Sequence, residues 1–374
     1  MSEKRLVYLA NVPWRSFSQR AHMFVRWIHD QYGAQVLWVD PYPIRFPRLS
    51  DWRRLQKLAS KEQEVQPSWL EVVKTTSLPL EPMLGSQYIN SVFWRPLHRK
   101  IDAFIKKGDA LIAIGKPSAF ALQLLGHHEH TPFLYDAMDD VPEFFTGRAR
   151  EAARWRESEI ALRVDRIWVS SHTLQKKFSH HAAKTDLVLN ACADDSLPQL
   201  PQSTVNRDVS PSSPVLGYVG AMAQWFDWDW VIKLAHKCPQ ARIRLIGPLV
   251  TSPSQPMPGN IEILPACEHR DALNHMRNFD VGLIPFQINE LTEAVDPIKY
   301  YEYRAMGLPV ITSRFGQMRR RTSDKHIFFA EQDAAFDTIV KQALACRVEH
   351  RHVQEFREIH TWRRRFNSTN LIFA

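Results

Sequence analysis

Short runs of apolar residues alternate along the chain with longer stretches in which apolar residues recur every three or four positions. Such runs are typical of buried parallel strands, and such stretches are typical of amphipathic helices. Strands are predicted at 5–11, 34–40, 109–115, 131–137, 166–171, 185–191, 214–220, 241–247, 260–266, 280–286, 308–312 and 326–330. Helices are predicted at 19–32, 95–107, from 118, and at 148–164, 228–237, 272–278, 297–306 and after 333. This alternation indicates an α/β fold with two doubly wound, Rossmann-like domains.

One stretch without periodicity divides the chain, because residues 196–214 hold four prolines and five serines. Structureless loops longer than about 15 residues are uncommon inside a compact domain. We therefore expect a first domain at 1–195, a linker at 196–214, a second domain at 215–345 and a helical segment at 346–374. A ligand is expected at the carboxyl ends of the strands, in a cleft between the two domains.

Composition narrows the class of protein. The chain is 44% hydrophobic and 24% charged, and no apolar run approaches the roughly 18 residues of a membrane span. The N-terminus lacks the features of a secretory signal, so a cytoplasmic location is expected. Four cysteines lie far apart without a C-x-x-C pair, which argues against a zinc site or a disulfide framework. The net charge of +8 favours an anionic partner: nucleic acid, acidic lipid or a phosphorylated small molecule.

The segment 294–312, AVDPIKYYEYRAMGLPVIT, places a carboxylate where a helix should be apolar. With Asp296 as N-cap, Pro297 at the first position and Gly307 past the end, a ten-residue helix is predicted. Its core-facing stripe includes Glu302, three residues after Lys299. Glu302 either pairs with Lys299 on a wet surface or meets the paired hydroxyls of a ribose, with a diphosphate at the helix N-terminus.

The same segment resembles the donor-site signature of glycosyltransferases with the two-domain GT-B architecture. Residues 216–248, 279–299, 165–178 and 187–195 are similar to further parts of that family, most of all to its family-4-like, teichuronic-acid and exopolysaccharide (xanthan glucuronosyltransferase-like) members. The resemblance implies that Glu302 holds the nucleotide ribose and that the start of the last helix, Thr361 and Trp362, leads a segment crossing back to the first domain. The donor-binding residues it implies are Gly220, Ala221, Met222, Gly247, Pro248, Phe286, Asn289, Thr292, Lys299, Tyr301 and Glu302.

Two departures from that family bear on mechanism. Many relatives have a second glutamate seven residues before the first, where this chain has Ala294 with Glu293 one place earlier. Relatives also carry basic residues after the glycine that corresponds to Gly220, where this chain has none. The diphosphate is therefore expected to meet Lys299 and backbone N–H groups after Gly220 and in the 286–296 loop, and the stereochemistry stays open.

Carboxylates also follow the strand predicted at 131–137: Asp136, Asp139 and Asp140. Inversion at the sugar needs a general base, and similar inverting transferases imply Asp139 or Asp140 for that role. The alternatives are that Asp140 caps the next turn and that Asp136 bonds the backbone. Asp227 and Asp229 have the D-x-D spacing of some metal sites, but at a helix start they are better interpreted as caps, so no metal is predicted.

Residues after the first strand, Trp14, Arg15, Arg20 and His22, are candidate acceptor contacts, the alternative being a helix with its polar residues in water. The histidine clusters at 126–131 and 179–181 are expected in surface loops. Basic residues alternate with aromatic ones at 51–58 and 93–107, which are either solvated helix faces or contacts of tryptophan and cations with an anionic membrane.

Together these features predict a glycosyltransferase, specifically a hexosyltransferase, of bacterial surface or exopolysaccharide synthesis. Its expected partners are a nucleotide-diphosphate sugar, with UDP-sugar favoured, and a lipid-linked or saccharide acceptor at the inner membrane face; no cofactor and no nucleic acid are expected. One alternative is an epimerase or phosphorylase of the same architecture. Another is a nucleic-acid-binding protein, suggested by charge alone, although no recognisable nucleic-acid-reading module is present.

Overall fold

The computed structural model of the chain describes residues 2–16, 20–42, 66–78, 81, 86–192, 197, 213–331, 334–369, 371 and 373. Its contacts divide the chain into two units. Unit 1 is Met1–Val169, Leu174–Leu187 and Thr369–Ala374, and unit 2 is Ser170–Thr173 and Val188–Ser368. Some predicted features lie outside the described residues, namely Gln19 and the basic stretch 51–58. The linker predicted at 196–214 also lies outside them, except for residues 197, 213 and 214.

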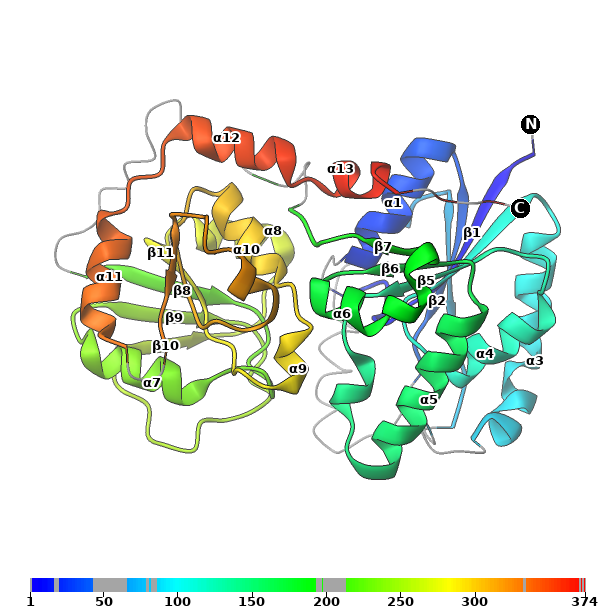
Figure 1. Cartoon of the computed structure of the whole chain (residues 1–374), viewed down its shortest axis with the longest axis horizontal. Helices are drawn as coiled ribbons and strands as arrows, with labels where there is room; N and C mark the ends of the chain where they lie inside the picture. The colour runs from blue at the N-terminus through cyan, green and yellow to red at the C-terminus, as the bar shows by residue number, and fades with distance from the viewer. Residues whose placement is uncertain are drawn as a thin grey trace. The chain divides into compact units, whose positions relative to one another are not determined.

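Unit 1 is built on a parallel sheet of seven strands in the order β3-β2-β1-β4-β5-β6-β7 (Figure 1). In chain order these are β1 (Lys4–Leu9), β2 (Gln35–Asp40), β3 (Leu70–Lys74), β4 (Asp109–Ile114), β5 (Phe133–Ala137), β6 (Arg166–Val169) and β7 (Thr185–Leu187). The central strands are almost wholly buried, as their apolar runs predict. The strand order reverses between β1 and β4, and such a switch point is where open α/β sheets bind ligands.

Helices cover both faces of this sheet (Figure 1). They are α1 (Arg20–Tyr32), α3 (Ser86–Ile105), α4 (Ala119–His127), α5 (Gly147–Arg163) and α6 (His172–Lys177), with 3-10 turns η1 (Val141–Phe144) and η2 (Ser179–Lys184). Successive residues of β5 identify the two faces, because side chains alternate along a strand. The Tyr135 hydroxyl donates to Glu157 on α5 at 2.8 Å, and the next residue, Asp136, pairs with Arg20 on α1.

Unit 2 contains a second parallel sheet, of six strands in the order β10-β9-β8-β11-β12-β13. The strands are β8 (Val215–Val219), β9 (Arg242–Ile246), β10 (Ile261–Leu264), β11 (Val281–Ile284), β12 (Val310–Thr312) and β13 (Ile327–Phe329). The helices are α7 (Trp228–Lys237), α8 (His269–Met276), α9 (Glu290–Glu293), α10 (Ile298–Ala305), η3 (Gly316–Arg320), α11 (Phe336–Ala345), α12 (His350–Ile359) and α13 (Trp362–Asn367). The order again reverses between β8 and β11, which fixes a second switch point.

Two features of the fold, at β3 and α3, differ from the predicted elements. Strand β3 is absent from the prediction, since it is a sheet-edge strand that is mostly accessible and so lacks an apolar run. Helix α3 begins at Ser86, nine residues before the predicted start, and contains Pro96 in its interior. The last residues return to unit 1, where Phe373 packs against Tyr32 with ring centroids 5.5 Å apart.

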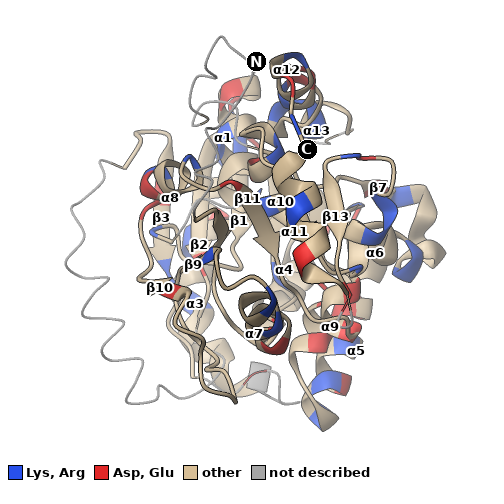
Figure 2. Cartoon of the chain, turned by 90° about the vertical axis from the view of Figure 1, so that its left-hand side faces the viewer, with Lys and Arg blue, Asp and Glu red and all other residues tan. Residues whose placement is uncertain are grey.

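Charged positions of both signs are interspersed along the helices of each unit (Figure 2). All four cysteines are free thiols, as their spacing predicts, and Cys192 and Cys238 are buried. Of the described helices, none is long and apolar enough to cross a membrane.

Candidate active site

Glu302 lies on α10, the helix that follows β11 and the short α9. Its side chain is only 7% exposed, and Lys299 Nζ approaches Oε2 to 2.5 Å. His269, the first residue of α8, lies on the other side with Nδ1 3.8 Å from Oε1. The pairing of Glu302 with Lys299 is therefore present, but it is largely buried and not on a wet surface. A carboxylate has about four lone-pair sites, so these two neighbours leave room for further hydrogen-bond donors.

Tyr303, one residue further on, fixes α10 to the sheet beneath. Its buried hydroxyl accepts a hydrogen bond from the Val219 amide at 3.1 Å, at the carboxyl end of β8. Gly282 on β11 makes the close approach of the ring possible, because a Cβ there would lie 2.4 Å from the Tyr303 ring. The helix that carries Glu302 is thus held at the switch point between β8 and β11.

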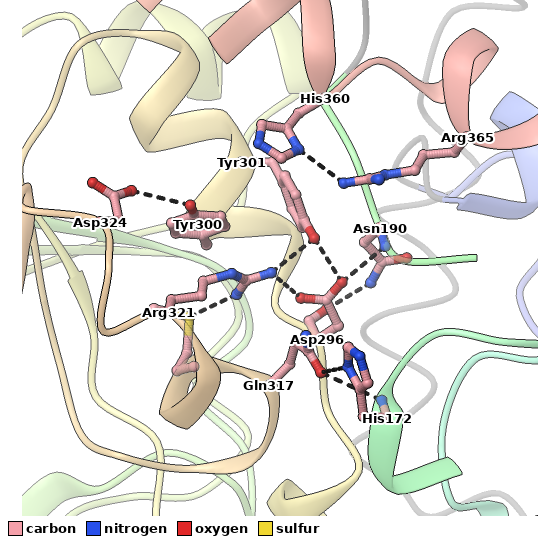
Figure 3. Close-up of polar contacts among 11 residues, drawn as sticks. His172, Asn190, Asp296, Tyr300, Tyr301, Gln317, Arg321, Asp324, His360 and Arg365 are labelled. Carbon is pink, nitrogen blue, oxygen red and sulfur yellow. Dashed lines mark hydrogen bonds and ion pairs between the residues drawn. The ribbon is translucent and has the colours of Figure 1, made fainter. Parts of the chain in front are cut away.

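Asp296 is buried just before α10 and does not cap it, contrary to the prediction. Pro297 occupies the N-cap position, while Gly307, with a φ of 71°, ends the helix as predicted. The Asp296 carboxylate instead accepts from the Asn190 amide at 2.8 Å and lies 2.5 Å from Arg321 Nη2 (Figure 3). A buried carboxylate with these partners fixes the start of α10 to the chain segment at Asn190.

Tyr301 is predicted to bind the donor, but the structure places it in this buried network (Figure 3). It is 1% exposed, and its hydroxyl donates to Asp296 at 2.9 Å while accepting from Arg321 at 2.7 Å. The same buried surroundings raise the pKa of Tyr301 well above its ordinary value. Tyr301 therefore positions α10, and its hydroxyl is already satisfied.

Two further contacts in Figure 3 involve histidines. Gln317 Oε1 lies 3.0 Å from Nδ1 of His172 and accepts from the His172 amide at 3.3 Å. His360 Nδ1 accepts from Arg365 Nη2 at 2.8 Å, and burial lowers the pKa of His360 to about 4. The sequence does not predict either contact, because each histidine meets its partner only in the folded chain.

The predicted glycine loops pack against each other and leave fewer free amides than expected. The Gly220 amide donates to Ile246 and the Met222 amide donates to Pro248, at 2.9 and 3.0 Å. A Cβ at Gly247 would lie 2.1 Å from the Gly220 carbonyl oxygen, so this contact requires glycine. Met222 is completely buried, and the Ala221 carbonyl accepts from the Tyr218 hydroxyl. The amides of Gly220 and Met222 are therefore already bonded, so the expected diphosphate contact after Gly220 is limited to other amides of this loop.

The 286–296 loop is also internally bonded. Asn289 and Thr292 form a capping box, in which Asn289 Oδ1 accepts from the Thr292 amide and Thr292 Oγ1 accepts from the Asn289 amide. The Phe286 ring packs against Phe315, with centroids 5.0 Å apart. The side chains of these three predicted donor residues thus shape the loop, in which Gln287, Ile288, Asn289 and Glu290 are exposed.

In unit 1, Asp136 and Arg20 form an ion pair that is almost inaccessible to solvent. Arg20 Nε donates to Asp136 at 2.9 Å, and the two side chains are 2% and 0% exposed. Arg20 is therefore wrongly predicted as an acceptor contact. Asp136 bonds this side chain and not the backbone, contrary to the alternative raised for it.

Asp139 and Asp140 follow β5 and have different surroundings. Asp140 accepts from Lys177 at 2.7 Å and stands at the N-cap of η1 without a capping hydrogen bond from its side chain. Asp139 makes no hydrogen bond or ion pair through its side chain with any residue that the structure describes. Burial, with Asp140 and Asp136 nearby, raises the pKa of Asp139 to about 6, although Arg20 opposes the shift. Of the two predicted bases, Asp139 has the chemistry of a proton acceptor.

His22 is a core residue and not an acceptor contact. It is 2% exposed, its Nε2 lies 2.9 Å from the Trp14 carbonyl, and its ring packs between Trp14 and Trp38. Burial lowers the pKa of His22 to about 4. Of the four predicted acceptor residues, Trp14 and Arg15 remain accessible.

A pocket that the sequence does not predict lies at the carboxyl ends of β1, β2 and β4. It is a shallow hollow of about 330 Å³ when the open solvent in it is counted, and its polar lining includes Asp40, Thr75, Lys116 and Ser118. Burial lowers the pKa of Lys116, while the nearby Glu81 opposes the shift. The pocket adjoins the switch point of the first sheet, where a polar ligand is expected in this fold class.

The other predicted sites are resolved by local structure. Asp227 caps α7 by accepting from the Trp230 amide at 2.9 Å, which confirms its interpretation as a cap. Among the described ranges, no group of three His, Cys, Asp or Glu side chains could hold a metal ion. His127 and His180 are exposed, whereas His128 is partly buried and lies 3.2 Å from Asp102.

The chain is similar to known glycosyltransferases in sequence and in fold. No family model matches the chain. A stretch of 225 residues is 23% identical to the putative teichuronic acid biosynthesis glycosyltransferase TuaH of Bacillus subtilis, covering 55% of this chain and 56% of TuaH. The match therefore spans little more than half the length of that relative.

Solved structures match over nearly the whole chain at low identity. Sucrose-phosphate synthase from Thermosynechococcus elongatus is 12% identical, with a TM-score of 0.65 over 98% of this chain and 97% of its own. HepE from Anabaena, in complex with UDP and glucose, is 13% identical, with 0.63 over 97% and 98%. The UDP-forming α,α-trehalose-phosphate synthase from Burkholderia vietnamiensis is 13% identical, with 0.60 over 98% and 96%. The predicted architecture is confirmed: the chain has the GT-B fold of these glycosyltransferases.

Proposed function

We propose that this chain is a hexosyltransferase that moves a sugar from a nucleotide-diphosphate sugar to a saccharide or lipid-linked acceptor. UDP is the expected nucleotide, because similar structures are complexes with UDP, UDP-glucose or UDP-2-fluoro glucose. The likeness to TuaH supports a role in bacterial surface polysaccharide synthesis. On this proposal the protein acts in the cytoplasm, at the inner face of the membrane.

The observation that carries the proposal is the nearly buried Glu302 beside Lys299 at the carboxyl edge of the second sheet. A carboxylate there is costly unless donors meet it, and the two ribose hydroxyls are suitably spaced donors. Lys299 supplies the positive charge for a diphosphate, assisted by the positive end of the α10 dipole. We assign the ribose to Glu302 and the diphosphate to Lys299.

In unit 1 we assign the general base to Asp139. An acceptor hydroxyl becomes a nucleophile when a carboxylate within hydrogen-bond reach takes its proton. Among the residues that the structure describes, none forms an ion pair with Asp139, and its raised pKa matches a group that exchanges protons near neutral pH. This assignment supports inversion at the sugar, and it separates a transferase from an epimerase, which needs no acceptor.

Thermal-shift measurements with UDP, GDP, ADP, dTDP and their glucose conjugates test the donor site. We expect one nucleotide to stabilise the protein by about 2.7 kcal/mol at a hundred times its dissociation constant. Glu302→Ala and Glu302→Gln should abolish that shift. Glu293→Ala is the matched control, since Glu293 is an accessible carboxylate of the same loop that pairs with Arg319. No shift with any nucleotide, or an equal shift in the Glu302 variants, would overturn the assignment.

A further inference from the structure

The first half of α3 exposes a group of large apolar side chains. Tyr88 is 77% exposed, Val92 58%, Ile89 53% and Phe93 43%. Trp94, the tryptophan that the sequence suggests for a membrane interface, is instead completely buried. Exposed apolar groups gathered in this way mark an interaction surface more often than single exposed side chains do.

These apolar side chains share one face of α3 with basic residues. Taking 100° per residue, positions 88, 89, 92 and 93 fall within roughly 160° of the helix circumference, together with Arg95, Arg99 and Lys100. All three basic residues are exposed. The face formed by these seven residues, called here the α3 face, therefore combines an apolar end with a cationic end.

Acidic residues compensate only part of the charge of the α3 face. No aspartate or glutamate occurs between Glu81 and Asp102 in the sequence. Lys100 lies 2.5 Å from Glu71, while neither Arg95 nor Arg99 has an ion-pair partner among the residues that the structure describes. An anionic surface is thus the complementary partner.

The opposite side of α3 holds the helix firmly in unit 1. Asn90 is fully buried and makes two hydrogen bonds with the backbone of Leu78, at 2.8 and 3.1 Å. Trp94 packs against Tyr42 and Phe120, with centroids 5.6 and 5.4 Å away. The exposure of the α3 face is therefore a property of a packed helix and not of a frayed end.

We propose that the α3 face docks on an anionic lipid bilayer. Tyrosine and phenylalanine at the headgroup boundary, flanked by arginine and without acidic residues, form the chemistry of an interfacial helix. The choice of a lipid surface rests on the proposed function, in which the acceptor is lipid-linked. Docking through α3 would bring unit 1, and with it Asp139, to the surface where that acceptor lies.

Flotation of the full chain with vesicles tests the docking surface. Vesicles of phosphatidylglycerol and phosphatidylcholine in equal parts are compared with pure phosphatidylcholine at low and high salt. We expect binding to the anionic vesicles only, weakened by salt. Val92→Ser/Phe93→Ser should reduce it at least tenfold, and Arg95→Ser/Arg99→Ser by about fivefold for each charge.

Matched controls distinguish binding through the α3 face from nonspecific binding through other exposed apolar or basic side chains. Leu162→Ser removes another exposed apolar side chain of unit 1, and Arg148→Ser/Lys176→Ser removes two other exposed cations. Both controls should bind within twofold of the unsubstituted chain. Circular dichroism melts verify that all variants fold.

Three outcomes would overturn the proposal: equal binding to neutral vesicles, unchanged binding by both α3-face variants, or an α3 face that instead closes a dimer, seen as a change in size-exclusion elution. Failure of the proposed function is read separately, from the nucleotide thermal shift, which needs no vesicle. Vesicle binding without a nucleotide shift would retain the α3 face and reject the transferase.

Discussion

Two carboxylates at the carboxyl edges of the two sheets, Asp139 in unit 1 and Glu302 in unit 2, have opposite surroundings. Glu302 lies 2.5 Å from Lys299 and 3.8 Å from His269. Asp139 has no hydrogen-bond or ion-pair partner among the described side chains, and burial raises its pKa to about 6. A carboxylate beside a cation is suited to accepting hydrogen bonds from a ligand, whereas one without a partner is suited to accepting a proton.

The two sites have a similar support despite this difference. Behind Asp139 lies the buried Asp136–Arg20 pair, and before Glu302 lies the buried Asp296–Arg321 pair. Each pair joins segments more than twenty residues apart in the chain, and both aspartates are fully buried, although the Arg321 side chain is 10% exposed. In each unit the ion pair holds its segment in place, next to the carboxylate to which we assign the chemistry.

Asp139→Asn is the most direct test of the different roles assigned to the two carboxylates. If Asp139 is the base, removing it should lower the rate of sugar transfer by about 10² to 10⁴. Donor binding, measured by thermal shift, should remain because it depends on Glu302. Asp140→Asn is the control, since Asp140 already pairs with Lys177. If the Asp140 variant is the more damaged, the two roles are exchanged.

The pH profile of transfer gives an independent check on the same residue. A base must be deprotonated, so the rate should fall about tenfold for each pH unit below the pKa of about 6 and reach a plateau above it. A profile that is flat between pH 5 and 8 would contradict Asp139 as the base.

Much of the fold follows from local sequence. Buried parallel strands appear as apolar runs, and the end of α10 at Gly307 follows from a glycine that can adopt a positive φ. Strand β3 escapes prediction because a half-exposed strand has no apolar run. The unusual position of Glu302 can also be recognised from the sequence alone, because a carboxylate stands there on the apolar stripe of the helix.

The errors at the site share one cause, which is a distant partner. Asp296 has the composition of an N-cap, but its carboxylate bonds Asn190, 106 residues away. Arg20 resembles a solvent-facing residue of a helix, but its partner Asp136 is 116 residues away. Capping and amphipathic preferences are local, so they cannot anticipate a partner that folding brings from a distant part of the chain.

Arg20→Met tests whether the buried pairs are equivalent supports. The change leaves Asp136 charged and unpaired in the core, which should lower the free energy of unfolding by about 3 to 5 kcal/mol in urea denaturation. Arg321→Met should cost less than Arg20→Met, because Asp296 keeps hydrogen bonds from Asn190 and Tyr301. The double variant Arg20→Met/Asp136→Leu should regain most of the loss. If Arg321→Met lowers the free energy of unfolding more than Arg20→Met does, the Asp296–Arg321 pair contributes more to stability than the Asp136–Arg20 pair.

The ionisation of Asp139 should also have a small effect on the stability of the folded protein. Its pKa is about 6 in the folded chain against 3.8 in its ordinary state, so the folded state binds the proton more tightly, and stability declines as pH rises through that window. Above pH 6 the ionised, partly buried group should destabilise the fold by about 1 to 2 kcal/mol after solvent screening. Asp139→Asn should therefore be the more stable protein at pH 8 and equal to wild type at pH 4. Asp140→Asn should show the opposite sign at pH 8, because it breaks the pair with Lys177. Denaturation curves at both pH values measure this, and an Asp139→Asn variant that is less stable at pH 8 would mean that Asp139 has a partner after all.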